Sequence, residues 1–201
     1  MSTRSAREAA LTDAVMTIVA EHGLERVSVR EVAGAAGVSI GTVQHYFPTK
    51  EQMLAAAYTE AVDRIRARVE ALPLGSDAGR NLRSVLRQLL PLDESRRAES
   101  RVYLAFAAAA ATSASLSEIQ QATLTELHTA LTDAFGRATG EAWPPSRCRL
   151  AAHAVIALVD GLALHAVTTG GWIDTAQLTD AVDLVLDGLL VDTAATPSAT
   201  A

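Results

Sequence analysis

Apolar residues recur at the spacing of an α-helix along most of the chain and predict an all-α protein. In the first predicted helix, one stripe combines five apolar side chains: Leu11, Ala14, Val15, Ile18 and Val19. Caps and helix breakers extend the prediction to about nine helices, over residues 4–22, 28–36, 39–46, 49–71, 77–90, 93–111, 115–138, 146–168 and 175–190. No segment shows the alternation that is typical of a β-strand.

Short polar residues and breakers mark the ends of the helices between residues 28 and 53. Residues 28–31 (Ser-Val-Arg-Glu) predict a capping box, in which the serine and the glutamate each bind a backbone N–H of the other. Gly37 predicts a tight turn, and Ser39 caps the next helix. Pro48 ends that helix, and Thr49 caps the one that follows. The segment therefore predicts two short helices joined by a glycine turn and followed by a long helix.

The chain is expected to contain two functional parts. Residues 1–48 form an N-terminal head of three helices, and residues 49–192 form a larger helical body. The helix over residues 49–71 joins the two parts. Residues 193–201 are small and polar and predict a disordered tail.

Composition supports helices but does not by itself indicate a binding partner. The chain has 201 residues, of which 49% are hydrophobic and only 4% aromatic, and much of the apolar content is alanine, the best helix former. The formal net charge of -6 argues mildly against nucleic-acid binding. Residues 1–50, however, contain equal numbers of basic and acidic residues, so the acidic charge lies in the body. A neutral head can bind DNA if its few cations converge.

The segment with the clearest functional signal is residues 28–53, SVREVAGAAGVSIGTVQHYFPTKEQM. A pair of short helices of this kind presents its second helix to the major groove of DNA. The second helix carries polar groups for base edges at Thr42, Gln44 and His45, beside Ile40. Gly41 is expected to allow a close backbone approach. Thr49 and Lys50 place free N–H groups and a cation at a helix N-terminus, where phosphates bind.

These residues resemble the TetR family of transcriptional regulators. The match covers residues 8–58 and includes LERVSVREVAGAAGVSIGTV and YFPTKEQML. Gln44 departs from the family, because most members have a tyrosine there that contacts phosphate. We expect Gln44 to contact a base instead, with Tyr46 as a nearby phosphate ligand.

The predicted DNA-binding residues fall into two groups. Phosphate contacts are predicted for Ser28, Arg30, Thr42, Tyr46 and Lys50, with Ser39 included as the cap of its helix. Base contacts are predicted for Gly41, Gln44 and His45. Arg4 and Arg7 are expected to add backbone contacts from a loose N-terminal arm.

The resemblance implies a homodimer, in which the last two helices form a four-helix bundle with those of a second subunit. The residues support this, because both helices are apolar around more of their circumference than one core face needs. Small residues at Ala151, Ala154, Ala157 and Gly161 would allow close helix approach. A fully buried helix in a monomer is the alternative. A dimer would place two heads on double-stranded DNA with a palindromic operator.

Residues 90–108 resemble the C-terminal domain of the branch that includes the betaine-pathway repressor, which implies a small-molecule effector of unknown identity. The candidate pocket residues are Leu86, Leu89, Tyr103, Phe106, Leu124, His128, Trp143, His153 and Ile156. Each of them is a core residue in the alternative interpretation. An effector bound there is expected to move the helix over residues 49–71 and to change the spacing of the two heads.

Other functions have weaker support. The residues best suited to catalysis are His153, Asp160 and His165, but their spacing does not place all three on one face, and no catalytic motif is present. No metal site or cofactor is predicted, since three histidines on two helices do not form one. Cys148 beside two arginines could sense oxidants, although an incidental cysteine is the simpler interpretation. A helical interaction module without DNA binding and a transcriptional activator both stay open.

The sequence also suggests where the protein works. A single cysteine excludes a disulfide within the chain and fits the reducing cytoplasm. Charges at Arg4, Arg7, Glu8 and Asp13 interrupt any signal-peptide core. The apolar run over residues 102–111 is too short to cross a bilayer. We therefore expect a cytoplasmic protein with no membrane partner.

Overall fold

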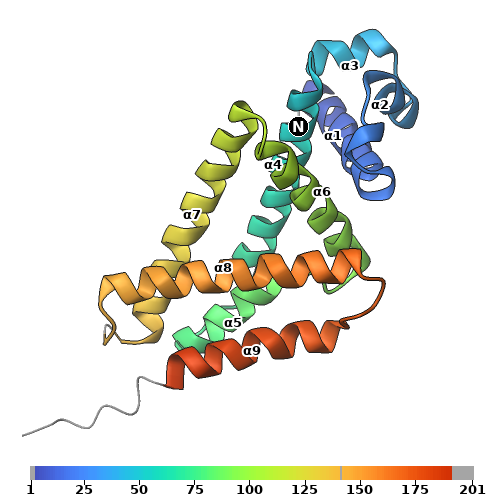
Figure 1. Ribbon diagram of the computed structural model, residues 1–201. Helices are drawn as coiled ribbons and strands as arrows, with labels where there is room; N and C mark the ends of the chain where they lie inside the picture. Colours follow the sequence, from blue (N-terminus) through green and yellow to red (C-terminus); the bar gives the residue numbers. More distant parts are fainter. Residues whose placement is uncertain (1–2, 141, 192–201) are drawn as a thin grey trace, which may run out of the picture. The chain divides into compact units, whose positions relative to one another are not determined.

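The computed structural model of the protein describes residues 3–140 and 142–191, without the side chains of residues 3–5 and 191. In this part of the chain it contains nine α-helices, one 3₁₀ turn and no strand (Figure 1). The elements are α1 (Thr3–His22), η1 (Leu24–Arg26), α2 (Val29–Ala36), α3 (Ile40–Tyr46), α4 (Lys50–Glu70), α5 (Ala78–Gln88), α6 (Glu94–Ala110), α7 (Ala114–Ala138), α8 (Pro145–Thr168) and α9 (Thr175–Val191). The predicted all-α fold is confirmed, while the predicted tail lies outside the described residues.

The helices α2, α3, α4 and α6 each begin where a short polar side chain accepts a backbone hydrogen bond. Ser28 accepts from the Glu31 N–H at 3.2 Å, Ser39 from Thr42 at 3.1 Å, Thr49 from Gln52 at 3.2 Å, and Asp93 from Arg96 at 2.9 Å. Each bond satisfies an N–H that has no acceptor within its own helix.

Glu31 does not complete the capping box predicted over residues 28–31. Its carboxylate lies 3.6 Å from the guanidinium of Arg26, on the preceding 3₁₀ turn, rather than on the backbone of Ser28. The reciprocal pair is instead formed one helix later, where the Thr49 N–H donates to Gln52 Oε1 at 3.1 Å. A cation near Glu31 explains the difference, because a charged pair competes with a hydrogen bond to a neutral N–H.

Replacing Asp93 by alanine should lower the free energy of unfolding by about 1 kcal/mol, because the Arg96 N–H loses its acceptor at the start of α6. Asp93 also pairs with the Arg96 guanidinium at 3.0 Å, but a partly exposed pair contributes less. Asp93→Asn keeps the acceptor and removes the charge, so it should retain most of the stability. Urea unfolding of the three proteins measures this. An asparagine variant as unstable as the alanine variant would show that the charge matters and the cap does not.

Contacts between the helices divide the chain into two compact units. Within the described residues, unit 1 comprises residues 3–66 and 93–121, and unit 2 comprises residues 67–92 and 122–191. The helices α4 and α7 each contribute to both units. The predicted functional boundary after residue 48 stays a prediction. The unit that holds α2 and α3 extends beyond this boundary, to most of α4 and to α6.

The core of unit 1 is built on α1, which packs against α2 and α6. Tyr58 of α4 is almost fully buried and stacks on Phe106 of α6, with ring centroids 4.0 Å apart. Tyr103 lies on the same helix as Phe106, with its ring 5.7 Å from that of Tyr58. This aromatic cluster fixes α6 and α4 together, and the short helices α2 and α3 are held on the same core.

The core of unit 2 combines apolar residues of α5, α7, α8 and α9. Two ion pairs also connect α5 to α9. The Arg83 guanidinium lies 2.5 Å from the Asp187 carboxylate, and the Arg87 guanidinium lies 2.5 Å from the Asp183 carboxylate. Since these pairs are partly exposed, they orient the two helices more than they stabilise them.

The helix α8 is long and apolar enough to cross a membrane, and it is the one such helix in the described residues. The expectation based on residues 102–111 overlooked it. Length and apolar composition are equally the properties of a helix with one side in a core and the other against a second protein surface. The positions of its apolar side chains are therefore more informative than its composition.

Candidate DNA-binding site

The helix α3 buries one side and exposes the other. Val43 has no exposed surface and packs in the core of unit 1. Ile40, Gln44 and His45 have exposed side chains, and Gly41 exposes its backbone. Because residues three and four apart are neighbours on a helix, these four positions form one surface. It offers an aliphatic group, an amide and an imidazole, which are groups suited to base edges in a major groove.

Two hydroxyl groups at the start of α3 are hydrogen-bonded to each other. Ser39 Oγ lies 2.9 Å from Thr42 Oγ1 and also accepts the Thr42 N–H. The Ser39 side chain is therefore used as the helix cap. The hydroxyl of the half-buried Thr42 is already hydrogen-bonded, so it is less available to bind a phosphate than an unpaired threonine hydroxyl would be. Both remain predicted DNA contacts.

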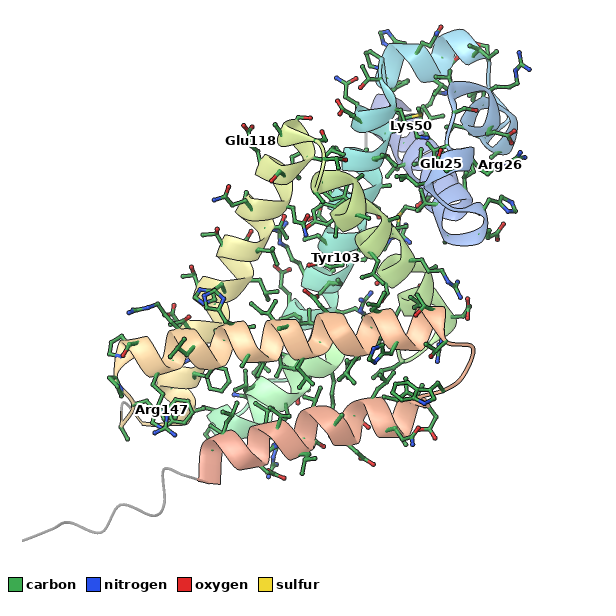
Figure 2. The ribbon with its side chains drawn as sticks, in the orientation of Figure 1. Glu25, Arg26, Lys50, Tyr103, Glu118 and Arg147 are labelled. Carbon is green, nitrogen blue, oxygen red and sulfur yellow. The ribbon has the colours of Figure 1, made fainter. Side chains whose placement is uncertain are left out.

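Two exposed cations precede and follow α3 along the chain. Arg30 lies in the first turn of α2. Lys50, which is labelled in Figure 2, is the first residue of α4. In the described part of the chain, neither lies within ion-pair distance of a carboxylate. Ser28 is exposed at the start of α2, and Tyr46 is half-buried at the end of α3, with its ring 5.3 Å from that of His45. All nine predicted DNA-binding residues thus lie within unit 1, between Ser28 and Lys50.

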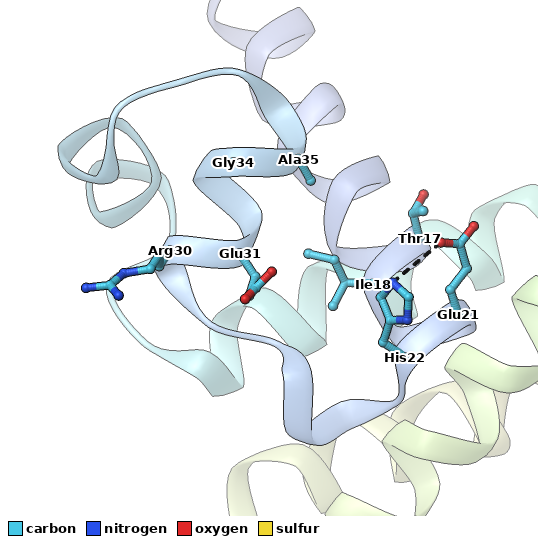
Figure 3. Close-up of a pocket in the computed structure, with 8 residues that line it drawn as sticks. All are labelled: Thr17, Ile18, Glu21, His22, Arg30, Glu31, Gly34 and Ala35. Atoms are coloured by element: carbon cyan, nitrogen blue, oxygen red, sulfur yellow. Dashed lines mark ion pairs between the residues drawn. The ribbon is translucent and has the colours of Figure 1, made fainter.

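A hollow of about 340 Å³ lies between α1 and α2 (Figure 3). Its lining residues are Thr17, Ile18, Glu21, His22, Arg30, Glu31, Gly34 and Ala35. Arg30 points away from Ile18 and His22 in Figure 3, whereas Glu31 points to the side on which they lie. The carboxylates of Glu21 and Glu31 make the hollow unfavourable for phosphate. Because Arg30 points away from Ile18 and His22, its guanidinium is available to a ligand outside the hollow.

The prediction of a loose N-terminal arm at Arg4 and Arg7 is wrong. Because α1 begins at Thr3, the backbone of Arg4 and of Arg7 is already helical. Residues 3–8 contain no glycine or proline, so nothing in this segment stops the helix from extending to its first residues. The side chain of Arg4 lies outside the described residues.

Gly41 is not required by the packing of the protein. A methyl group at this position would meet nothing nearer than Ser39 Oγ, at 3.9 Å. The expected close approach is therefore absent within the described chain, and any need for glycine must come from a molecule that binds α3. In an exposed helix, glycine also costs stability relative to alanine.

Gly41→Ala should raise the free energy of unfolding by about 0.5–1 kcal/mol and weaken DNA binding, because the new methyl group stands between α3 and the DNA. Gly34→Ala is the matched control, since Gly34 is also a helical glycine with open space around it. Gly34→Ala should raise the free energy of unfolding and leave the affinity for DNA unchanged. Thermal unfolding and DNA titration of both variants measure this. Unchanged DNA affinity in Gly41→Ala would contradict a close approach of DNA at this position.

Large apolar side chains are exposed on both α8 and α9, and we refer to these side chains as the apolar face of α8 and α9. Leu150 and Leu164 of α8 are 69% and 44% exposed, and Leu184 of α9 is 74% exposed. Ala154, Ala157 and Gly161 lie between the two α8 leucines at helical spacing, and none of the three is buried. Ala151 differs from the expectation, because it is buried in the core of unit 2. The small residues of this face would let another helix approach closely.

The candidate pocket residues are distributed over both units. Tyr103 and Phe106 belong to the aromatic cluster of unit 1. In unit 2, Leu86 and Trp143 are buried, whereas Leu89, Leu124 and Ile156 are half-buried. His128 and His153 come together, with ring centroids 3.9 Å apart, and His128 Nε2 lies 3.1 Å from the Arg149 carbonyl oxygen. Their role in ligand binding stays a prediction.

The residues considered for other chemistry do not form a site. No group of three or more histidine, cysteine or acidic residues that could hold a metal occurs in the described residues. His153, Asp160 and His165 all lie on α8, spread over several turns. Cys148 is buried in the core of unit 2, so oxidants have little access to its thiol.

Asp160 is an acidic residue in a largely apolar helix. Burial raises the pKa of its carboxyl from 3.8 to about 6, because the charged form loses water. Within the described residues, no hydrogen bond or ion pair offsets this cost. The side chain is therefore half-protonated near pH 6.

Asp160→Asn should stabilise the protein at pH 7.5 by about 1–2 kcal/mol. This gain is smaller than the full pKa shift would give, because water still partly reaches the side chain. The folded-state pKa lies above the unfolded value, so the contribution of Asp160 to stability is greatest below pH 3.8 and is lost as the pH rises through about 6. The variant stays neutral, so the two proteins should match near pH 4. Asp180→Asn, at an exposed position on α9, is the control. Thermal unfolding at both pH values measures the difference, and a gain of equal size at both would contradict the explanation.

Comparison with known proteins agrees with this geometry. Residues 11–57 match the family of bacterial regulatory proteins of the tetR type, and residues 78–191 match the BetI-type transcriptional repressor C-terminal domain. The HTH-type transcriptional regulator BetI of Burkholderia thailandensis is 31% identical over 189 residues, which cover 91% of this chain and 95% of that protein.

Solved structures give the same result. A transcriptional regulator from Rhodococcus sp. Rha1 is 40% identical, with a TM-score of 0.86 and coverage of 94% of this chain and 99% of that one. A regulator from Saccharomonospora viridis, solved in complex with choline, is 18% identical and shares the fold, with a TM-score of 0.79 over 91% of this chain and 96% of that one. The chain therefore belongs to the TetR family of bacterial transcriptional regulators, DNA-binding proteins rather than enzymes, and carries a C-terminal domain of the BetI type.

Proposed function

We propose that this protein is a homodimeric repressor that binds a palindromic operator through α3 and leaves it when a small molecule binds to the body. The observation that carries the proposal is the exposed surface of α3, with Gln44 and His45 free for base edges. The exposed cations Arg30 and Lys50 are suited to the phosphates on either side. Such a protein works where the chromosome is, in the bacterial cytoplasm.

The exposed apolar face of α8 and α9 supports the dimer. In a two-fold dimer the same patch occurs on both subunits, so Leu150, Leu164 and Leu184 would meet their counterparts or one another. Removal of these side chains from water stabilises the dimer by about 25 cal/mol per Å² of apolar surface. Two α3 helices related by this symmetry fit two half-sites separated by about one turn of DNA or a multiple of it.

Choline is the first effector to test. It is the ligand in the Saccharomonospora viridis structure, which shares the fold of this chain. The body of this chain also provides a carboxylate without a counter-ion in the described residues, Asp160 on α8.

Selection from a library of fragments of the source genome tests the proposal. The purified full-length protein should enrich a small set of fragments that share an inverted repeat, and choline should lower their recovery. Enrichment that choline leaves unchanged would contradict choline as effector while retaining the DNA-binding function. Failure to enrich any fragment would contradict the proposed function itself.

A further inference from the structure

Ile40 is an aliphatic residue in an unusual place. It is the first residue of α3 and is 46% exposed. Within the described chain, the other exposed large apolar side chains are Leu74, Leu150, Leu164, Trp172 and Leu184, all in unit 2. A β-branched residue also favours the helix less than alanine does. Neither packing nor helix formation therefore accounts for isoleucine at this position.

The neighbours of Ile40 leave its side chain accessible to a molecule that binds α3. Gly41 has no side chain, and the space beside it is open. The hydroxyls of Ser39 and Thr42 are bound to each other at 2.9 Å. Gln44 lies one turn along on the same side of the helix and is exposed. The accessible surface is thus a branched aliphatic group next to a free amide.

An A·T base pair presents the matching pair of groups in the major groove. Adenine N6 and N7 offer a donor and an acceptor to an amide, and the thymine C5 methyl group offers an apolar contact. Four residues of helix rise by about 6 Å, which is less than two base-pair steps of about 3.4 Å. Ile40 and Gln44 can therefore reach the same base pair or adjacent ones.

We propose that Ile40 contacts the C5 methyl group of a thymine in each half-site, at the base pair bound by Gln44 or at the next one. Ile40 is then a specificity-determining residue that distinguishes thymine from cytosine by shape, without a hydrogen bond. This inference rests on the proposed function, because it requires α3 to bind in the major groove.

Replacement of thymine by deoxyuridine tests the inference, because it removes the methyl group and leaves the hydrogen-bonding groups in place. The probe is a duplex with the inverted repeat obtained from the genomic selection, with each thymine replaced in turn in both half-sites. Affinity of the full-length protein should fall at one symmetric position by about fourfold per half-site, the effect of one buried methyl group.

Ile40→Ala identifies the side chain that makes the contact. This variant should lose affinity for the thymine duplex to a similar extent, and deoxyuridine at the sensitive position should cause no further loss. The exposure of Ile40 and the helix preference of alanine should keep the variant folded, which thermal unfolding checks. Leu74→Ala, at another exposed aliphatic residue, should bind like the wild type and keep its deoxyuridine sensitivity.

Two results overturn the inference. One is a wild type that binds the repeat with equal affinity whichever thymine is replaced. The other is an Ile40→Ala variant that keeps the full deoxyuridine sensitivity of the wild type. Either result would leave the proposed function intact, whereas a protein that selects no duplex at all would refute both.

Discussion

Leu184→Arg should convert the protein from a dimer to a monomer. Leu184 is 74% exposed on α9, in the apolar face that we assign to the subunit interface. In a symmetric dimer the substitution occurs twice, and it places two like charges without partners in an apolar contact. Each such charge costs several kcal/mol when it is removed from water, so the dimer dissociation constant should rise by at least about 100-fold.

Leu74→Arg is the matched control, because Leu74 is 53% exposed but lies in the segment between α4 and α5, outside the α8 and α9 face. It should sediment like the wild type. Sedimentation velocity at several concentrations distinguishes monomer from dimer, and thermal unfolding checks that the variants are folded. Leu184→Arg should also lose most of its affinity for the operator, since a monomer holds only one half-site. A Leu184→Arg protein that remains dimeric would place the interface elsewhere.

Gln44→Ala should reduce operator affinity by about 30-fold to 25,000-fold while the dimer is retained. A bidentate contact from glutamine to adenine contributes about 1–3 kcal/mol, and a palindromic operator contains it twice. Gln44 is exposed, and its truncation leaves Val43 and the rest of the core of unit 1 unchanged. The loss should therefore appear in DNA binding and not in unfolding.

Gln44→Tyr separates a base contact from a general contact. Tyrosine is the usual family residue at this position, where it binds phosphate. This variant should keep part of its affinity but discriminate less between the operator and a scrambled duplex. Titration of wild type and both variants on the two duplexes measures the difference. Equal losses on operator and scrambled DNA in Gln44→Ala would show that Gln44 contacts the backbone and not a base.

The helices and their caps could be predicted because local chemistry determines them. Ser39 and Asp93 bind the N–H groups that their residue types and spacing indicate. Glu31 could not be placed, because its partner Arg26 lies on a 3₁₀ turn that has no distinct apolar pattern. The helix from residue 4 was predicted, and only the loose arm expected at Arg4 and Arg7 was wrong, since polar residues at a chain end suit a helix and a coil equally well.

The contacts between distant parts of the chain were less predictable. Tyr103 and Phe106 were grouped in one pocket with residues that lie in unit 2, yet their rings pack on Tyr58 of α4 in unit 1. Apolar spacing identifies the buried side of a helix but not the helix that covers it. Ile40, by contrast, was expected beside the polar groups that the second helix presents, and its 46% exposure agrees with this.

Titration of the purified protein against its own upstream intergenic DNA, at several salt concentrations, tests the central claim most directly. The account predicts binding at least about 1,000-fold tighter than to a scrambled duplex of equal length and composition, with an affinity that falls steeply as salt rises. Equal affinity for the two duplexes at every salt concentration would mean that α3 does not recognise bases in this DNA, and would contradict the claim.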